Sequence, residues 1–183
     1  VWIYYLTHHL FYDFDNTLCT LESLGKDKVI LVLNRQPQCS GCQQHLLKYL
    51  SALDTSEVML ACLLGRVDSY LQRRQQLAQL EEQGGGRLKP LYEVEDEAYG
   101  LLHSQHSYPS LVLWQKWWGV VAVFDTSSIF TEDLDRYEFS KVFLNDLRRF
   151  VGNWFFTSPR LQVSTSKRLN LIDSSIKNCI FAS

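Results

Sequence analysis

Two cysteines separated by two residues, in the order Cys39-Ser40-Gly41-Cys42, are the residues whose types and spacing favour covalent chemistry. A thiolate attacks a disulfide sulfur to form a mixed disulfide, which a neighbouring thiol can then break. The free N–H groups at the start of a helix favour a thiolate over a thiol. A cysteine pair with this spacing at a helix start is therefore suited to dithiol–disulfide chemistry.

A strand before this pair and a helix after it must position the two thiols. Residues Val29–Leu33 are a continuous apolar run rich in β-branched side chains, as expected for a central strand covered on both faces. From Gln43 to about Leu53, an apolar stripe predicts an amphipathic helix. The stripe comprises Leu46, Leu47, Leu50 and Leu53. This arrangement puts Cys39 near the helix N-terminus and Cys42 about one turn later.

Length, composition and charge favour one domain and exclude several classes of partner. The 183 residues are 46% hydrophobic, which is enough for a single sizeable core. A formal net charge of -2, without a basic block, argues against nucleic acid as a partner. Because the sequence has no apolar stretch long enough to cross a bilayer, membrane association is expected only through a leader or anchor that this sequence does not contain.

The remaining cysteines are single residues. The total of five is odd and too small for a disulfide-stapled scaffold in a chain of 183 residues. Cys62 lies within the apolar run 58–64 and is expected to be a small buried side chain. The pair at positions 39 and 42 therefore remains the candidate redox centre.

The first half of the chain predicts alternating strands and helices. A short strand is expected at Thr17–Leu21 and a buried strand at 57–64. The next segment, to about Gln83, predicts a helix with Val67, Tyr70, Leu71, Leu77 and Leu80 on its inner side and Asp68, Arg73, Arg74 and Glu81 mostly outside. This β-α-β-α order implies parallel strands joined by right-handed crossovers.

The second half predicts a different order. A short strand is expected at 88–92 and a short helix at 95–103. Apolar runs at 111–114 and 119–124 predict an antiparallel hairpin. Spaced aromatic and aliphatic residues then predict a closing helix over 132–150.

The last part of the chain differs in composition from the rest. Residues 151–183 are rich in serine and threonine and show only weak alternation of apolar and polar side chains. We expect residues 1–150 to form the main domain and 151–183 to be a C-terminal extension of uncertain structure: extra strands, a packed extension or a loose tail.

This order of elements, with the cysteine pair at a helix start and a proline before a hairpin, resembles the thioredoxin superfamily. The segment Thr17–Lys26 is similar to the hairpin and lead-in of the TlpA/ResA-like branch, which is related to AhpC/TSA proteins. The resemblance spans residues 11–150. It implies a three-layer α/β/α thioredoxin-like fold with a central mixed sheet, an N-terminal β-hairpin extension and a C-terminal extension.

The resemblance implies a thiol–disulfide oxidoreductase that needs no cofactor and no metal. In that reading Cys39 attacks a client disulfide as a thiolate, and Cys42 then attacks Cys39 to release the client. The implied partners are client protein thiols or disulfides and a protein that regenerates the redox state. The implied location is the bacterial envelope, periplasmic or extracytoplasmic, where disulfides persist.

The resemblance also assigns a substrate groove. In the family the proline before the hairpin is cis and faces the disulfide, and Pro109, after Tyr108, has the matching position. Together with Ser40 and Gly41, which lie between the two cysteines, these residues are expected to hold the backbone of the client.

The chain departs from the family pattern at three places. Ser40-Gly41 stands between the cysteines where relatives often have Gly-Pro or a similar pair. Gln38 precedes the first cysteine where relatives usually have tryptophan. Many relatives also have an acidic or polar group near the end of the first central strand that assists proton transfer, and this chain offers Leu33 and Asn34 there.

Two alternatives use the same residues differently. Thiolates and imidazole suit copper, so the cysteine pair with His45, or with His103 or His106, predicts a copper site in a thioredoxin-like protein. The second alternative is a redox-inactive interaction protein that retains the motif. A peroxidase is disfavoured, because Gln36 occupies the place of the threonine that peroxiredoxins require three residues before the reactive cysteine.

Overall fold

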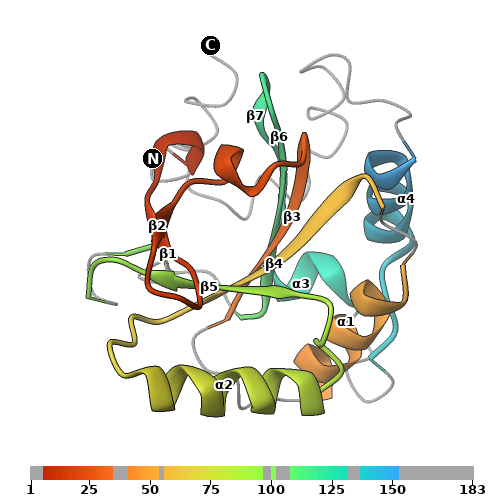
Figure 1. The fold of residues 1–183 in the computed structure, drawn as a ribbon. Helices are drawn as coiled ribbons and strands as arrows, with labels where there is room; N and C mark the ends of the chain where they lie inside the picture. The colour runs from red at the N-terminus through yellow and green to blue at the C-terminus, as the bar shows by residue number, and fades with distance from the viewer. Residues whose placement is uncertain are drawn as a thin grey trace.

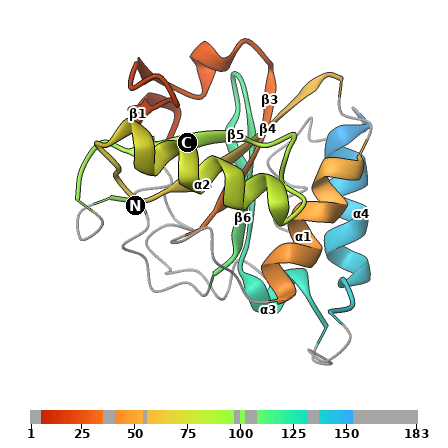
Figure 2. The same ribbon diagram turned by 60° about the horizontal axis from the view of Figure 1, so that its bottom comes forward.

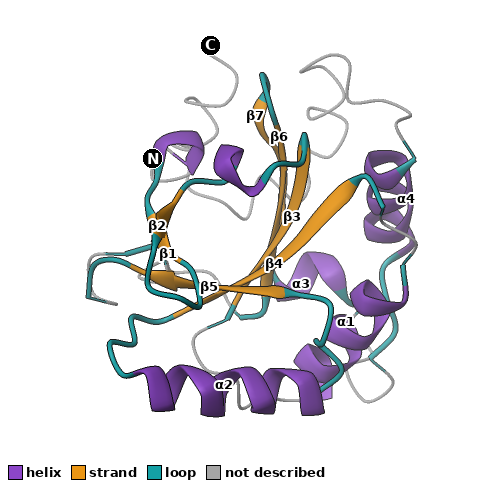
Figure 3. Cartoon of the chain, viewed as in Figure 1, coloured by secondary structure: helices purple, strands orange, loops and turns teal. Residues whose placement is uncertain are grey.

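The computed structural model describes residues 6–34, 41–53, 56–96, 100–101, 108–131 and 137–152. Figures 1 and 3 show how the elements are arranged. In chain order they are β1 (Phe11–Tyr12), β2 (Leu18–Cys19), the 3-10 helix η2 (Glu22–Leu24), β3 (Lys28–Leu33), α1 (Gly41–Ala52), β4 (Val58–Leu64), α2 (Tyr70–Glu82), β5 (Lys89–Glu93), β6 (Ser110–Gln115), β7 (Gly119–Phe124), α3 (Thr126–Ile129) and α4 (Lys141–Val151).

The strands form one mixed sheet in the order β2-β1-β5-β4-β3-β6-β7. β3, β4 and β5 are parallel, as their separation by α1 and α2 predicts, whereas β6 and β7 form the expected antiparallel hairpin. Since β3, β4 and β5 run in the same direction, their carboxyl ends meet at one end of the sheet. We call this the carboxyl end of the sheet; β6, which is antiparallel to β3, begins there.

Two hydrophobic cores lie on the two faces of the sheet. All six residues of β3 are buried, and alternate side chains enter opposite cores: Ile30 and Val32 on one face, Leu31 and Leu33 on the other. α1, α2 and α4 all contribute to the first core (Figure 2). In the described residues, the second core is closed by Leu6, Leu21, Leu101 and other side chains outside the α-helices.

The predicted inner side of α2 is partly wrong. Leu80 is buried as expected, but Tyr70 and Leu71 are exposed and Arg73 is buried. Arg73 turns inward because its guanidinium finds backbone acceptors: it donates to the carbonyl oxygens of Phe14, Val67 and Asp68 at 3.0, 3.2 and 3.0 Å. These three bonds compensate for burying the charge, which a prediction from hydrophobicity does not anticipate.

The predicted helix at 95–103 is absent from the described part of that range, since Glu95, Asp96, Gly100 and Leu101 are not helical. The N–H of Gly100 donates to the carbonyl of Asp96 at 3.1 Å, which closes a single turn. The N–H of Leu101 donates to the Glu93 carboxylate at 2.7 Å instead of continuing a helix.

The closing helix begins later than predicted. α4 starts at Lys141, and residues 137–140 before it are not helical. Phe139 forms an isolated antiparallel bridge with Phe130, and the N–H of Thr131 donates to the carbonyl of Glu138 at 2.8 Å. Aromatic spacing predicts a helix here, but Phe139 packs from the β-bridge with Phe130 instead.

The predicted N-terminal hairpin is present, whereas the predicted C-terminal extension lies outside the described residues. β1 and β2 form the expected N-terminal hairpin, with Tyr12 opposite Leu18, although β2 is shorter than the predicted strand Thr17–Leu21. Residues 153–183 lie outside the described residues, so the C-terminal extension stays a prediction. None of the described helices has the length and apolar character needed to cross a membrane.

Candidate functional site

The second cysteine of the pair lies on the first turn of α1. Cys42 is half-buried there and packs against the first core. Cys39 and Ser40 lie outside the described residues, so the distance between the two sulfurs stays a prediction. The nearest described residues on either side are Asn34, one residue beyond β3, and Gly41.

The ring of Tyr137 lies against Gly41, a contact that the sequence does not predict. A Cβ atom at this position would overlap the ring of Tyr137, so the helix start accommodates the tyrosine only because the residue is glycine. Tyr137 has a positive φ of 49°, in the left-handed region. The sequence predicts Tyr137 within the closing helix, whereas the structure places its ring against Gly41, the first residue of α1.

Asn34 is the buried polar residue at the end of β3. Its backbone N–H donates to the carbonyl of Leu63 at 3.0 Å, and its side-chain Nδ2 donates to the sulfur of Cys62 at 3.1 Å. Asn34 is fully buried, as is Cys62, which confirms the expectation that Cys62 is a small buried side chain. Asn34 Oδ1 has no hydrogen-bond partner within the described residues.

Pro109 lies at the same end of the sheet as Asn34. Ser110, the first residue of β6, pairs with Leu33, the last residue of β3. Pro109 comes one residue before this pair, next to the end of β3. The Tyr108–Pro109 peptide bond is cis, as the resemblance implied. The Thr126 hydroxyl donates to the Pro109 carbonyl at 2.9 Å, which fixes the proline to the start of α3.

His45, a candidate copper ligand, packs against an aromatic ring. It is exposed on α1, and its ring stacks on Phe139 with centroids 4.8 Å apart. No group of three histidine, cysteine or acidic side chains in the described ranges is placed to hold a metal ion. His103 and His106 lie outside those ranges, as Cys39 does, so the copper site is not tested.

Cys19 lies on β2, outside the cysteine pair. It is half-buried there, and burial, together with the charge of Asp13, raises the pKa of its thiol. A raised pKa leaves less thiolate at neutral pH, and the thiolate is the nucleophile. Cys19 is therefore poorly suited to attack a disulfide.

Comparison with known proteins gives relatives only at the level of structure. No protein-family model matches the sequence, and no curated protein matches it. MTB DsbF, solved in mixed oxidized and reduced forms, matches with a TM-score of 0.53 and 15% identity, over 82% of this chain and 96% of that one. The thioredoxin domain of a thiol-disulfide oxidoreductase from Bacteroides vulgatus matches with a TM-score of 0.51 and 13% identity, over 78% and 91%. At these identities the likeness establishes a shared fold.

Proposed function

We propose that this chain, which has the thioredoxin-like fold, is an enzyme that exchanges disulfides with client proteins through Cys39 and Cys42. The observation that carries the proposal is the placement of Cys42. It lies on the first turn of the helix that follows β3, and Pro109 comes just before β6 at the carboxyl end of the sheet. MTB DsbF and the Bacteroides vulgatus oxidoreductase domain share this fold, which supports the same class of chemistry.

In the proposed reaction, the Cys39 thiolate attacks one sulfur of a client disulfide. A bond forms between Cys39 and that sulfur, and the other client sulfur leaves as a thiolate that takes up a proton. Cys42 then loses its proton and attacks the sulfur of Cys39, which releases the second client thiolate. The client gains two electrons, the chain is left with a Cys39–Cys42 disulfide, and the reverse sequence oxidises a client dithiol.

The surroundings of the helix start support this assignment. The first N–H groups of an α-helix have no partner within the helix, so the start of α1 is expected to favour a thiolate in the residues just before it. We propose that Tyr108, Pro109, Ser40 and Gly41 hold the backbone of the client. We propose that a second protein restores the starting redox state, and that the enzyme acts in an extracytoplasmic compartment, where client disulfides persist.

Replacement of the attacking cysteine tests the proposal directly. Cys39→Ser should reduce the rate of insulin-disulfide reduction to the uncatalysed level while the circular dichroism spectrum stays that of the wild type. Cys19→Ser is the matched control, because it removes a thiol outside the pair, and it should keep the wild-type rate. Full activity of Cys39→Ser would show that the nucleophile is wrongly assigned.

Replacement of the resolving cysteine should trap the intermediate. Without the Cys42 thiol, a mixed disulfide between Cys39 and a client cannot be released from within the chain, so Cys42→Ala should accumulate client adducts on non-reducing gels. The double variant Cys39→Ser/Cys42→Ala should accumulate none.

A Cu(I) titration separates the two alternatives if Cys42→Ala traps no client. Stoichiometric Cu(I) binding by the wild type that is lost in the double variant would identify the copper-binding alternative. Absence of Cu(I) binding would favour the redox-inactive alternative.

A further inference from the structure

The ring of Tyr137 fills the space beside Gly41, the residue that comes directly before Cys42. The atoms nearest to a Cβ placed at Gly41 are Oη, Cζ and Cε2 of Tyr137, and all three are closer than real Cβ atoms come to a neighbour. The edge of the ring that carries the hydroxyl therefore lies against the backbone at the start of α1.

Gly41 is a residue whose backbone is otherwise weakly restrained. Glycine has more conformational freedom than any other residue. Gly41 is also the first residue of α1, and the first N–H groups of a helix have no acceptor within the helix. The contact with Tyr137 therefore limits the backbone conformations that are available directly before Cys42.

Tyr137 is held by contacts between the segment 137–139 and the residues that follow α3. Phe139 forms an antiparallel bridge with Phe130, and the N–H of Thr131 donates to the carbonyl of Glu138 at 2.8 Å. Tyr137 itself has a φ of 49°, which is uncommon for a bulky side chain and persists only where surrounding contacts determine it. The position of its ring is thus set from outside α1.

The same part of the chain also contacts Pro109. The hydroxyl of Thr126, the first residue of α3, donates to the Pro109 carbonyl at 2.9 Å. Pro109 and Gly41 are both assigned to the proposed redox site. The α3 region therefore contacts residues of this site at two points, once through Thr126 and once through Tyr137.

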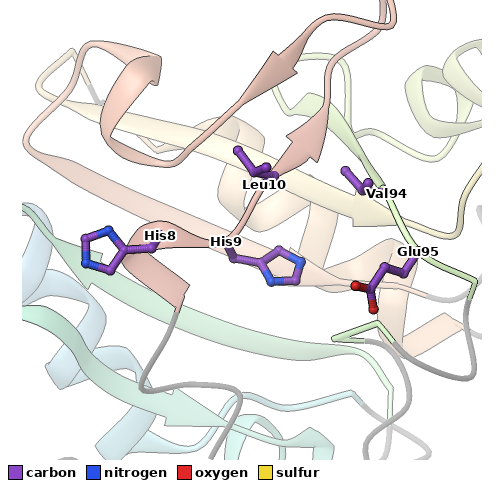
Figure 4. Close-up of a pocket in the computed structure, with 5 residues that line it drawn as sticks. All are labelled: His8, His9, Leu10, Val94 and Glu95. Carbon is purple, nitrogen blue, oxygen red and sulfur yellow. The ribbon is translucent and has the colours of Figure 1, made fainter.

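A pocket in the described part of the chain lies elsewhere, at the margin of β1 and β5 (Figure 4). Its lining comprises His8, His9, Leu10, Val94 and Glu95. Neither Gly41 nor Tyr137 lines this pocket, so a substitution of its exposed residue His8 should leave the contact at the start of α1 unchanged.

We propose that Tyr137 is a positioning residue for the cysteine pair, which restricts Gly41 so that Cys42 stays within reach of Cys39. The proposal rests on the proposed function, in which these two cysteines form a disulfide. Without the ring, the dithiol chain gains backbone conformations in which the two thiols are apart. A disulfide restricts the same backbone by its own geometry, so the added freedom stabilises mainly the dithiol.

The expected effect is on the equilibrium between dithiol and disulfide. In exchange with glutathione, the two thiols of the chain lose two electrons and two protons to one glutathione disulfide, which becomes two glutathione thiols. The freedom that one residue loses when its backbone is fixed corresponds to a factor of about five or more in an equilibrium constant. Removal of the ring should therefore lower the constant for disulfide formation about fivefold, which raises the reduction potential by about 20 mV.

Mass spectrometry can measure this constant for the cysteine pair alone. Trypsin cleaves after Arg35 and Lys48, and the peptide 36–48 contains Cys39 and Cys42 and no other cysteine. The full chain is equilibrated with glutathione buffers, alkylated to label the free thiols and then digested. The labelled fraction of this peptide in each buffer gives the constant.

Five variants separate the ring from general effects on the fold. Tyr137→Ala and Tyr137→Gly should both lower the constant about fivefold, and glycine adopts a positive φ readily, so the second variant loses the ring without backbone strain. Tyr137→Phe keeps the ring and should keep a constant close to that of the wild type. Tyr49→Ala removes an aromatic side chain about two turns later on α1, and His8→Ala changes the exposed residue of the pocket in Figure 4. Both should keep the wild-type constant.

The contact itself can be tested without any redox step. Gly41→Ala adds a methyl group that overlaps the Tyr137 ring, so it should lower the folding equilibrium constant of the wild type but not that of Tyr137→Ala. The two effects, measured by urea unfolding of the reduced chains, should differ about tenfold, as for residues in contact. Equal effects of Gly41→Ala in the two chains would overturn the proposal.

The redox measurements distinguish failure of the positioning role from failure of the proposed function. A wild-type pair that stays reduced in every glutathione buffer would contradict the proposed function, whether or not Gly41 and Tyr137 are coupled. A pair that forms its disulfide with the same constant in the wild type and in both variants without the ring would overturn the positioning role alone. An equal decrease in Tyr49→Ala would also overturn it, because a general loosening of the fold would then account for the effect.

Discussion

Tyr92 carries a buried hydroxyl on β5. The side chain is fully buried, and its Oη has no hydrogen-bond partner within the part of the chain that the structure describes. Removal from water disfavours the phenolate and raises the pKa of Tyr92 from 10.0 to about 12. Since the unfolded chain ionises near the lower value, ionisation of Tyr92 favours unfolding as the pH rises from 10 toward 12.

Tyr92→Phe should therefore change the pH dependence of stability. At pH 7 the variant should be as stable as the wild type or slightly more stable, because the lost hydroxyl has no hydrogen bond to lose. Between pH 10 and 12 its free energy of unfolding should fall less steeply than that of the wild type. Urea unfolding at several pH values measures both effects, and Tyr70→Phe, which removes the hydroxyl of an exposed tyrosine, is the control. Parallel curves for Tyr92→Phe and wild type would contradict the assigned cause.

Asn34 illustrates how far residue-level prediction extends. The sequence indicates that Leu33 or Asn34 occupies the polar position near the end of β3, and it does not choose between them. In the structure Leu33 enters the second core, whereas Asn34, beyond the strand, bonds to Cys62, a member of the first core. Only the assembled sheet decides this, because the choice depends on which face α1 covers.

Arg73 joins three segments around α2. It donates to carbonyls in the β1–β2 turn and in the loop between β4 and α2, and its guanidinium lies 5.8 Å from the centroid of the Tyr70 ring. α2 contributes Leu80, near its C-terminal end, to the first core. Near its N-terminal end, the hydrogen bonds of Arg73 attach the helix to the two loops. The helix is thus held by polar contacts at one end and by apolar packing at the other.

Arg73→Met should lower the free energy of unfolding by about 2–3 kcal/mol, because it removes hydrogen bonds from a charged donor to buried acceptors and keeps most of the side-chain volume. Arg74→Met, one residue later on the exposed side, should change stability by less than about 0.5 kcal/mol. Chemical denaturation of the two variants in parallel compares them. A loss of equal size in both would mean that the buried bonds of Arg73 contribute little.

At the scale of the whole molecule, α4 closes the described structure. Phe143, Leu147 and Phe150 are buried in the first core. Nζ of Lys28, at the start of β3, donates to the carbonyl of Phe150 at 2.7 Å. This bond satisfies a carbonyl at the helix C-terminus and links the central strand to the last described helix.

The expected boundary of the main domain follows from this closure. A chain that ends at Gly152 should still unfold cooperatively, because both described cores draw their residues from positions 6–151. A chain that ends at Ser140 should not fold, since it loses the aromatic side chains of α4. Thermal unfolding followed by circular dichroism distinguishes the two. Loss of the cooperative transition in the longer chain would show that residues 153–183 belong to the domain.

The central strand, the helix that carries Cys42 and the β6–β7 hairpin can be predicted from the amino-acid sequence. Each depends on hydrophobic periodicity and turn residues within a short window, so local composition is sufficient to predict them. The burial of Arg73, the close approach of Tyr137 to Gly41 and the contact of His9 with Glu93 depend instead on how distant segments pack together. His9 and Glu93 are 84 positions apart. Such pairs depend on which strands become neighbours and which polar groups lose water, and a single short segment does not contain that information.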